Sequence, residues 1–546
     1  MNDPSNFEIS GNVVDVISGK IFPGNVKVEN GKIISITPIS NPVSNYILPG
    51  LVDSHIHIES SMLIPSEFAR IAVVHGTVAT VSDPHEIANV LGIDGIRYMI
   101  ENGKKVPFKF YFGASSCVPA TGFETSGASL GVTEIEELLA MPEIKYMSEM
   151  MNFPGVLYED TEVMAKIAVA KKHSKPIDGH APGLTGNDVK KYIETGITTD
   201  HECFTMDEAL EKIRWGMNIQ IREGSAAKNF EALIDLLANH PDQVFLCSDD
   251  KHPNDLVEGH INQLVKRAVE KGYDPVTVIR SCTLNPVRHY QLDVGLLQPG
   301  DDADFIVVDN LKDFDILATY IRGQQVAGNG RSYINQVQES EPNLFNTEKI
   351  TPSDLRVESD STWVNCIRAF DGQLITENVR LEAKYDNGNL VSNINSDVLK
   401  IMVMNRYKKT KPVVGFINNF GFKTGAIAST VAHDSHNIIA VGTTDEQIAR
   451  AVNLLVETKG GISLVNGGME QVLPLPVAGL MSAKDGFVVA AAYDNMDKLA
   501  KSLGSKLNAP YMTLSFMALL VIPELKLSDM GLFDGKAFSF TTLLKN

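Results

Sequence analysis

The centre of the chain alternates short apolar runs with longer amphipathic segments. The apolar runs predict strands, and the segments between them carry helical periodicity. Eight strands, each followed by a helix-length connection, predict an α/β fold with a TIM-like (β/α)8 barrel. An open doubly wound sheet is the alternative, because strand counting alone does not exclude it. The predicted strands are 48–58, 76–82, 109–115, 144–150, 176–180, 196–201, 218–222 and 244–248, and the clearest helical stretches are 160–173, 185–194, 206–216 and 228–239.

The two flanks of this region have strand-like patterns with tight turns. Alternating apolar residues surround the Asn30-Gly31 pair, which strongly predicts a β-hairpin. A similar strand-like pattern occurs again after residue 293. We therefore expect residues 1–48 and 291–345 to form one small composite β-sandwich beside the barrel, residues 49–290. A polar stretch near 336–354 marks a linker. Beyond it, residues 346–546 are expected to form a C-terminal α+β domain whose glycine pairs serve turns rather than phosphate binding.

Composition and charge narrow the classes of function. With 44% apolar and 21% charged residues, the 546-residue chain resembles an ordinary soluble protein. Its net charge of −19 disfavours nucleic acid and anionic membrane surfaces as partners, so a small neutral or cationic substrate fits better. The sequence contains neither a signal peptide pattern nor an apolar run long enough to span a membrane, and we expect a cytoplasmic protein. Its five scattered cysteines predict reduced thiols.

Imidazoles and carboxylates gather at the ends of the predicted strands. His55 and His57 point to the same side of the first strand, because side chains alternate along a strand. In a (β/α)8 barrel the active site lies at the strands' C-terminal ends. Each such residue alone has a structural alternative, as a helix cap or a core histidine, but chance does not place them at so many successive strand ends. The other strand ends carry Asp83, His85 and Glu86; Glu149; Asp178 and His180; Asp200, His201 and Glu202; and Asp249 and Asp250.

This residue set has the chemistry of a metal-dependent hydrolase. Imidazole and carboxylate suit Zn²⁺, Mn²⁺ or Fe²⁺, and Glu149 is placed to bridge two ions. A metal lowers the pKa of its bound water to near neutrality, which makes the water a nucleophile. Asp249 is placed to take that water's proton and return it to the substrate.

His55, His57, His180, His201 and Asp249, in this order, resemble the amidohydrolase superfamily of metal-dependent hydrolases. Within it, the chain is similar over essentially its whole length to the adenine deaminase family of bacteria and archaea. That resemblance implies hydrolysis of adenine to hypoxanthine and ammonia in purine salvage, on two divalent ions, Mn²⁺ or Fe²⁺ with Zn²⁺ as the alternative. The resemblance is carried by residues 48–62, 82–92, 148–152, 178–184, 199–202 and 248–250, and by the C-terminal segments 433–437 and 460–462.

Two other functions remain open at this point. Another amidohydrolase would act on guanine or on a cyclic amide, but the cyclic amide hydrolases carry a carboxylated lysine on the fourth strand. Here Glu149 is the best-placed residue, and Lys145 comes too early in the strand. A catalytically silent barrel that serves as a scaffold is the non-enzyme alternative, although such a protein should have lost its ligands.

Weaker candidates lie next to the strand-end residues. His85 and Glu86 either bind an additional metal or the substrate, or cap a helix. Glu202 and His252 either reach the purine ring or serve the structure. Arg222 either forms an ion pair between the core and the surface or holds one of the site residues in place.

The segment His433-Asp-Ser-His436-Asn lies between two strand-like runs, which predicts a tight turn. One interpretation is that this turn closes over the barrel mouth, and the other is that it is solvated. We expect the C-terminal domain to contribute to substrate closure or to the contacts of a homo-oligomer, a dimer.

Overall fold

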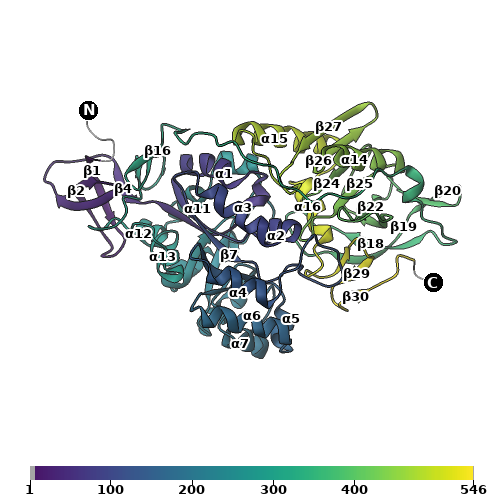
Figure 1. Ribbon diagram of the computed structural model, residues 1–546, viewed down its shortest axis with the longest axis horizontal. Coiled ribbons are helices and arrows are strands. Elements are labelled where there is room, and N and C mark those ends of the chain that lie inside the picture. Colours follow the sequence, from purple (N-terminus) through teal and green to yellow (C-terminus); the bar gives the residue numbers. More distant parts are fainter. Residues whose placement is uncertain (1–5, 545–546) are drawn as a thin grey trace.

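Eight parallel strands form a barrel at the centre of the molecule in the computed structural model, which describes residues 6–544 (Figure 1). Neighbouring strands pair in parallel from β5 to β9 and from β10 to β12. Thr198 N donates to Ile177 O at 2.9 Å, which joins the two sets. The barrel strands are β5 (Leu51–His57), β6 (Thr77–Ser82), β7 (Lys109–Ala114), β8 (Ile144–Met150), β9 (Ile177–Gly179), β10 (Thr199–Asp200), β11 (Asn218–Arg222), and β12 (Val244–Cys247) continued by β13 (Asp249–Asp250).

The last strand closes the barrel by changing partners. Up to Cys247 it pairs with β11, and after Ser248 it pairs with β5, where Asp249 lies opposite Ile56. Asp249 has a φ of +56°, in the left-handed region that non-glycine residues rarely adopt. This breaks the strand's alternation, so both Asp249 and Asp250 reach the barrel mouth. The closed sheet confirms the predicted barrel, and the doubly wound alternative is wrong.

Helices surround the barrel, and some of them begin at a residue whose side chain caps the helix. Asp160 caps α6 by accepting hydrogen bonds from the backbone of Glu162 and Val163. The predicted helix 228–239 is shorter, a helical turn followed by a 3-10 segment, Ile234–Ala238. The helices are α1 (Pro65–Ala72), α2 (His85–Leu91), α3 (Ile93–Gly103), α4 (Val132–Ala140), α5 (Phe153–Leu157), α6 (Thr161–Lys172), α7 (Gly186–Glu194), α8 (Met206–Arg214), α9 (Phe230–Leu233), α10 (Pro253–Glu258), α11 (Ile261–Glu270), α12 (Pro275–Ser281) and α13 (Leu284–Tyr290).

Both flanks join in one eight-stranded sheet at the barrel's side, where β14 pairs with β4. The predicted first strand, 48–58, is in fact two strands, because the chain leaves this sheet at Gly50 and enters the barrel. A Cβ at position 50 would lie 2.3 Å from Val78 Cγ1, so this crossing needs glycine. The sheet contains β1 (Phe7–Asp15), β2 (Lys20–Glu29), β3 (Lys32–Pro38), β4 (Tyr46–Pro49), β14 (Phe305–Val308), β15 (Ile316–Ile321), β16 (Gln324–Gly328) and β17 (Arg331–Ser332).

The C-terminal region is a mixed sheet with helices on both faces, which confirms the predicted α+β class. In β22 the side chains alternate: Met402 and Met404 pack with α14, whereas Ile401 belongs to the core on the other face. The elements are β18 (Trp363–Arg368), β19 (Glu377–Glu382), β20 (Lys384–Asp386), β21 (Asn389–Val391), β22 (Val398–Met404), β23 (Val413–Asn418), β24 (Ala426–Ser429), β25 (Ile438–Gly442), α14 (Asp445–Thr458), β26 (Gly461–Asn466), β27 (Met469–Pro474), α15 (Gly486–Ser502), α16 (Pro510–Ser515), β28 (Leu525–Leu527), β29 (Leu532–Asp534) and β30 (Ser539–Phe540).

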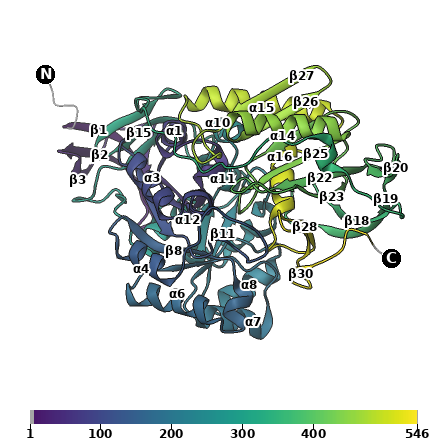
Figure 2. The same ribbon diagram turned by 45° about the vertical axis from the view of Figure 1, so that its right-hand side comes forward.

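The C-terminal domain is fused to the barrel rather than tethered to it. Figure 2 shows α15 running beside α1 and α10 of the barrel. Ser482 N donates to Met62 O at 2.9 Å, and Arg70 Nη1 pairs with Asp485 at 2.8 Å. One continuous apolar core includes both barrel residues and the inner face of the C-terminal sheet, Val52 and Ile401 among them. The two parts therefore share a core.

Two further sequence predictions can be compared with the structure. The five cysteines are buried and unpaired, which confirms that they are free thiols. Within residues 6–544, no helix is both long and apolar enough to cross a membrane.

Candidate metal centre

The centre of the barrel mouth begins with two histidines on β5. His55 and His57 are buried, with ring centroids 4.9 Å apart, and both face inward because they alternate with Ile56. Their Nε2 atoms lie 3.5 and 3.4 Å from Oδ1 of Asp249. His55, His57 and Asp249 thus point at a common position with atoms spaced to hold one ion.

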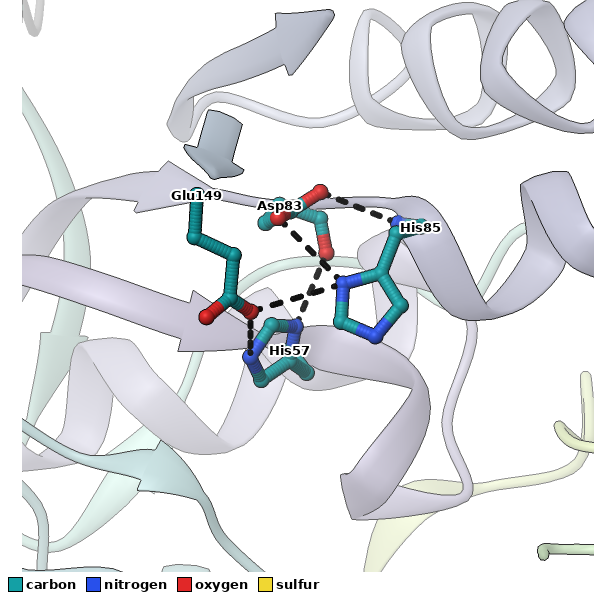
Figure 3. A group of neighbouring side chains, drawn as sticks. All are labelled: His57, Asp83, His85 and Glu149. Atoms are coloured by element: carbon teal, nitrogen blue, oxygen red, sulfur yellow. Dashed lines mark hydrogen bonds and ion pairs between the residues drawn. The ribbon is translucent and has the colours of Figure 1, made fainter. Parts of the chain in front are cut away.

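Glu149 reaches the mouth from the end of β8, and Figure 3 shows it beside His57 and His85. Its Oε1 lies 3.3 Å from Nε2 of His57. Its Oε2 lies 3.3 Å from Nε2 of His201 and 2.7 Å from Nδ1 of His180. The two oxygens of this carboxylate thus face different histidines.

Several ring nitrogens of the histidines at the centre have no hydrogen-bond partner. Both nitrogens of His55, Nε2 of His180 and Nδ1 of His201 are buried without a hydrogen-bond partner. Leaving a buried polar group unsatisfied costs about 1–3 kcal/mol each. Metal coordination would satisfy such nitrogens, and the surrounding ligands are all nitrogen and oxygen. The residues therefore fit the binding of divalent metal.

Arg222, left open by the sequence, forms a buried ion-pair network. Its Nη1 and Nη2 contact Glu202 at 2.5 and 2.8 Å, and Nη1 also contacts Asp249 Oδ2 at 2.7 Å. Burial would raise the pKa of Asp249, but Arg222 and the hydrogen bonds of His55 and His57 hold it well below its usual range. Asp249 is therefore an anion with one oxygen fixed by the guanidinium.

Glu202 and Glu149 both lie among the histidines of the centre. Glu202 Oε1 lies 3.5 Å from both His180 Nδ1 and His201 Nε2, in addition to its contacts with Arg222. For Glu149, burial raises the pKa, but His180 and His201 outweigh it and hold the pKa well below the ordinary value. Both carboxylates thus belong to the network around the histidines.

His85 lies at the edge of the centre, at the start of α2. Its Nδ1 is 3.2 Å from Asp83 Oδ2 and 3.6 Å from Glu149 Oε1, as Figure 3 shows. On the other side its Nε2 lies 3.5 Å from Asp434 Oδ1 of the C-terminal domain. His85 therefore connects the centre with the domain that covers it.

The C-terminal turn at residues 433–436 is buried against the barrel mouth. His433 and His436 are 4% and 0% exposed, and both lie 3.8 Å from Glu86. The interpretation of a solvated turn is wrong, because the sheet of the C-terminal domain presents this turn to the barrel instead of to water. His252 does not line the centre and instead hydrogen-bonds Tyr493 of α15 at 2.5 Å.

A cavity of about 30 Å³ remains between the barrel mouth and this cover, which is room for one or two water molecules. Sequence reasoning missed the apolar part of its lining, Leu374, Phe516 and Leu519, because apolar residues in a separate domain carry no signal of a site. The remaining lining residues are His57, His85, Glu149, Met151, His180, His201, Glu202, Arg222, Asp249, Asp250, His433 and Asp434.

Two family models match the chain, the amidohydrolase family over residues 46–326 and the adenine deaminase C-terminal domain over residues 373–539. Among curated proteins, an adenine deaminase of Sulfurovum sp. (strain NBC37-1) is 58% identical over 534 residues, covering 98% of this chain and 99% of the relative. An adenine deaminase of Methanosarcina mazei is 52% identical over 546 residues, with 98% of each chain covered. One of Salinibacter ruber is 52% identical over 539 residues, covering 98% and 99%.

Proposed function

This chain belongs to the adenine deaminase family of amidohydrolases, and from that membership we propose that its barrel mouth hydrolyses adenine to hypoxanthine and ammonia. The observation that carries this proposal is the high identity across both the barrel and its covering domain. The centre around Glu149 has the imidazoles and carboxylates that such a hydrolysis needs.

Divalent ions would be held by His55, His57, Glu149, His180, His201 and Asp249, and when bound they supply a strongly acidified water at neutral pH. The ligands are imidazole and carboxylate, which suits Mn²⁺ or Fe²⁺, with Zn²⁺ as an alternative. Two ions match the position of Glu149 between two groups of histidines.

Asp249 is the proton carrier in this proposal. A water attacks C6 of adenine, and Asp249 Oδ1 accepts the proton released by that water. A C–O bond forms, the C6–N6 bond breaks, and Asp249 returns the proton to N6, which leaves as ammonia. Arg222 holds Oδ2, so the other oxygen of Asp249 stays directed to the centre during both transfers.

The cover places apolar side chains beside the reaction site. Leu374, Phe516 and Leu519 of the C-terminal domain lie over the centre. The cavity beneath them is narrow, about 30 Å³, so we expect these side chains to move aside when adenine binds. The C-terminal domain thereby controls access to the centre.

Cyclic amide hydrolysis is disfavoured by the position of Lys145. This lysine lines a separate cavity with Lys104, Asp293 and Arg322, and it does not line the cavity at the metal centre. Glu149 takes the position that a bridging lysine would need.

The test is an assay of purified enzyme with adenine, guanine and a hydantoin in parallel, together with metal analysis of the same sample. We expect hypoxanthine and ammonia in equal amounts from adenine, and at least two divalent ions per chain. Turnover of guanine or hydantoin with none of adenine would overturn the proposal. The expected dimer stays a prediction that sedimentation of the same sample would measure.

A further inference from the structure

A second cluster of titratable residues lies where the barrel meets the C-terminal domain, next to the candidate centre. The barrel contributes Glu59 from the 3-10 turn Ile58–Ser61, Glu86 from α2 and Asp250 from β13. The C-terminal turn contributes His433 and His436. All five side chains are buried, and none of them belongs to the ligand set assigned above.

The geometry of this cluster leaves atoms unpaired. Ser60 Oγ lies 2.8 Å from Glu86 Oε1 and 2.6 Å from Asp250 Oδ1, but a hydroxyl has one proton and can donate to only one of them. Glu86 Oε1 is 3.8 Å from His433 Nδ1, and Glu86 Oε2 is 3.8 Å from His436 Nε2. Both separations are too long for hydrogen bonds, and Glu86 Oε2 and His436 Nε2 are buried without a partner.

Such separations suit atoms that share an ion. Two ligand atoms at about 2.1 Å from a tetrahedral metal lie roughly 3.4 Å apart. Ligand atoms of Glu86, Asp250 and His433 all lie within 4.8 Å of one another. A small inward movement of each side chain would bring them to coordination distance.

The charge of the cluster also calls for a cation. Within residues 6–544, Glu59, Glu86 and Asp250 have no ion pair with a lysine or arginine, and the basic side chains that face Glu86 are the histidines His433 and His436. Several buried carboxylates in one place cost much free energy unless protons or a cation compensate them.

We propose that Glu86, Asp250 and His433 bind a third divalent ion, which fastens the C-terminal turn to the barrel mouth. The mixed nitrogen and oxygen ligands suit Mn²⁺, Fe²⁺ or Zn²⁺. Two ligands belong to the barrel and one to the C-terminal domain, so this ion acts on the position of the cover. Because this ion has no part in the proton transfers, the inference stands or falls separately from the proposed deamination.

The decisive experiment is anomalous diffraction from crystals of full-length protein that was produced with Mn²⁺. We expect two peaks among His55, His57, Glu149, His180 and His201, and a third peak among Glu86, Asp250 and His433. Two peaks at the first position with none at the second would overturn this inference alone. No peak at either position would contradict both assignments.

Metal counting in variants gives a second readout that does not depend on activity. We expect about three Mn²⁺ per chain in the wild type, about two in His433→Gln and in Glu86→Gln, and three in the control His252→Gln, whose ring binds Tyr493 instead. Equal metal content in the wild type and in the folded variants would overturn the inference. If, in addition, the variants had a raised KM for adenine, the cluster would bind the purine instead of a metal.

Limited proteolysis reports on the proposed fastening. A chelator titrated until one ion is lost should make the wild-type segment near residue 433 cleavable, because the turn is then released. His433→Gln should be cleaved there without chelator, whereas His252→Gln should behave as the wild type. Protection of this segment that is the same with and without the ion would contradict the proposal.

Discussion

Arg222 Nη1 lies 2.7 Å from Oδ2 of Asp249, while Oδ1 of the same carboxylate faces Nε2 of His57 at 3.4 Å. One oxygen is therefore fixed by a guanidinium, and the other is directed to the metal centre. A carboxylate that is held on one side has little freedom to rotate, so the oxygen that exchanges protons keeps its position.

Asp249→Asn should separate proton transfer from folding. Asparagine tolerates the left-handed backbone at this position, so the fold should persist. The amide cannot carry the proton, and we expect kcat to fall by about 10²–10⁴-fold. Metal analysis and a thermal melt of the same sample provide the control. A metal-loaded variant with normal turnover would show that another group is the base.

Glu149→Gln tests the bridge between the two ions. A neutral amide compensates less of the charge of two neighbouring dications, so the second ion should bind about tenfold more weakly or worse. Titration of metal-free protein with Mn²⁺ measures this affinity. Two equally tight ions together with normal kinetics would place the bridge elsewhere.

His55→Ala combined with His57→Ala removes two neighbouring ligands from β5. We expect at least one ion to be lost, and the deamination of adenine with it. Elemental analysis decides the outcome, with the double variant His173→Ala, His240→Ala as a control at histidines outside the site. Full metal content in the β5 variant would rule out this strand as a ligand source.

A chain that ends at about residue 350 should be insoluble or poorly active. Removal of the C-terminal domain exposes barrel residues that share its apolar core, such as Leu63 and Ile64, and deletes the cover of the centre. Expression and gel filtration of the truncated chain check this expectation. A soluble truncated protein with undiminished activity on adenine would make the domain a separate module.

Lys526 provides a prediction on the pH dependence of stability. Its ammonium is buried against the carbonyl oxygens of Leu374 and Phe516, and burial lowers the pKa of Lys526 to about 7, from 10.5 for an ordinary lysine. Between these values the unfolded chain binds the proton and the folded chain does not, so this group makes the fold more stable as pH rises.

The comparison of the wild type with Lys526→Met isolates this effect. The free energy of unfolding of the wild type, measured relative to the variant, should rise by up to about 1.4 kcal/mol per pH unit between pH 7 and 10. Urea unfolding at several pH values measures it. A difference that does not change with pH would mean that the folded protein keeps the lysine charged.

The strand-end residues of the barrel were predictable because their pattern is local. His55 and His57 follow the period of two in one strand, and the apolar runs themselves locate the strand ends. The break at Gly50 was missed, because both sides of it are equally apolar and only the contact with Val78 requires the crossing. Periodicity within a strand cannot show which sheet each half joins.

The cover of the centre could not be predicted from a single sequence. The turn at His433 is as polar as a solvated loop, and only the packing of an entire domain buries it. Both Asp249 and Asp250 point inward because Asp249 has a left-handed backbone conformation. The residue types in this segment do not predict that conformation. Such features arise from tertiary contacts between distant segments.

The change of partners at Ser248 has a consequence for how the enzyme is made in the cell. During synthesis the first histidines emerge early, but Asp249 arrives only with the strand that closes the barrel, and the turn at His433 arrives much later. A ribosome-bound fragment that ends before β13 therefore carries the histidines and Glu149 but lacks Asp249. We therefore expect divalent metal to bind firmly only after the barrel has closed, and a chain that ends before Asp249 to bind it weakly.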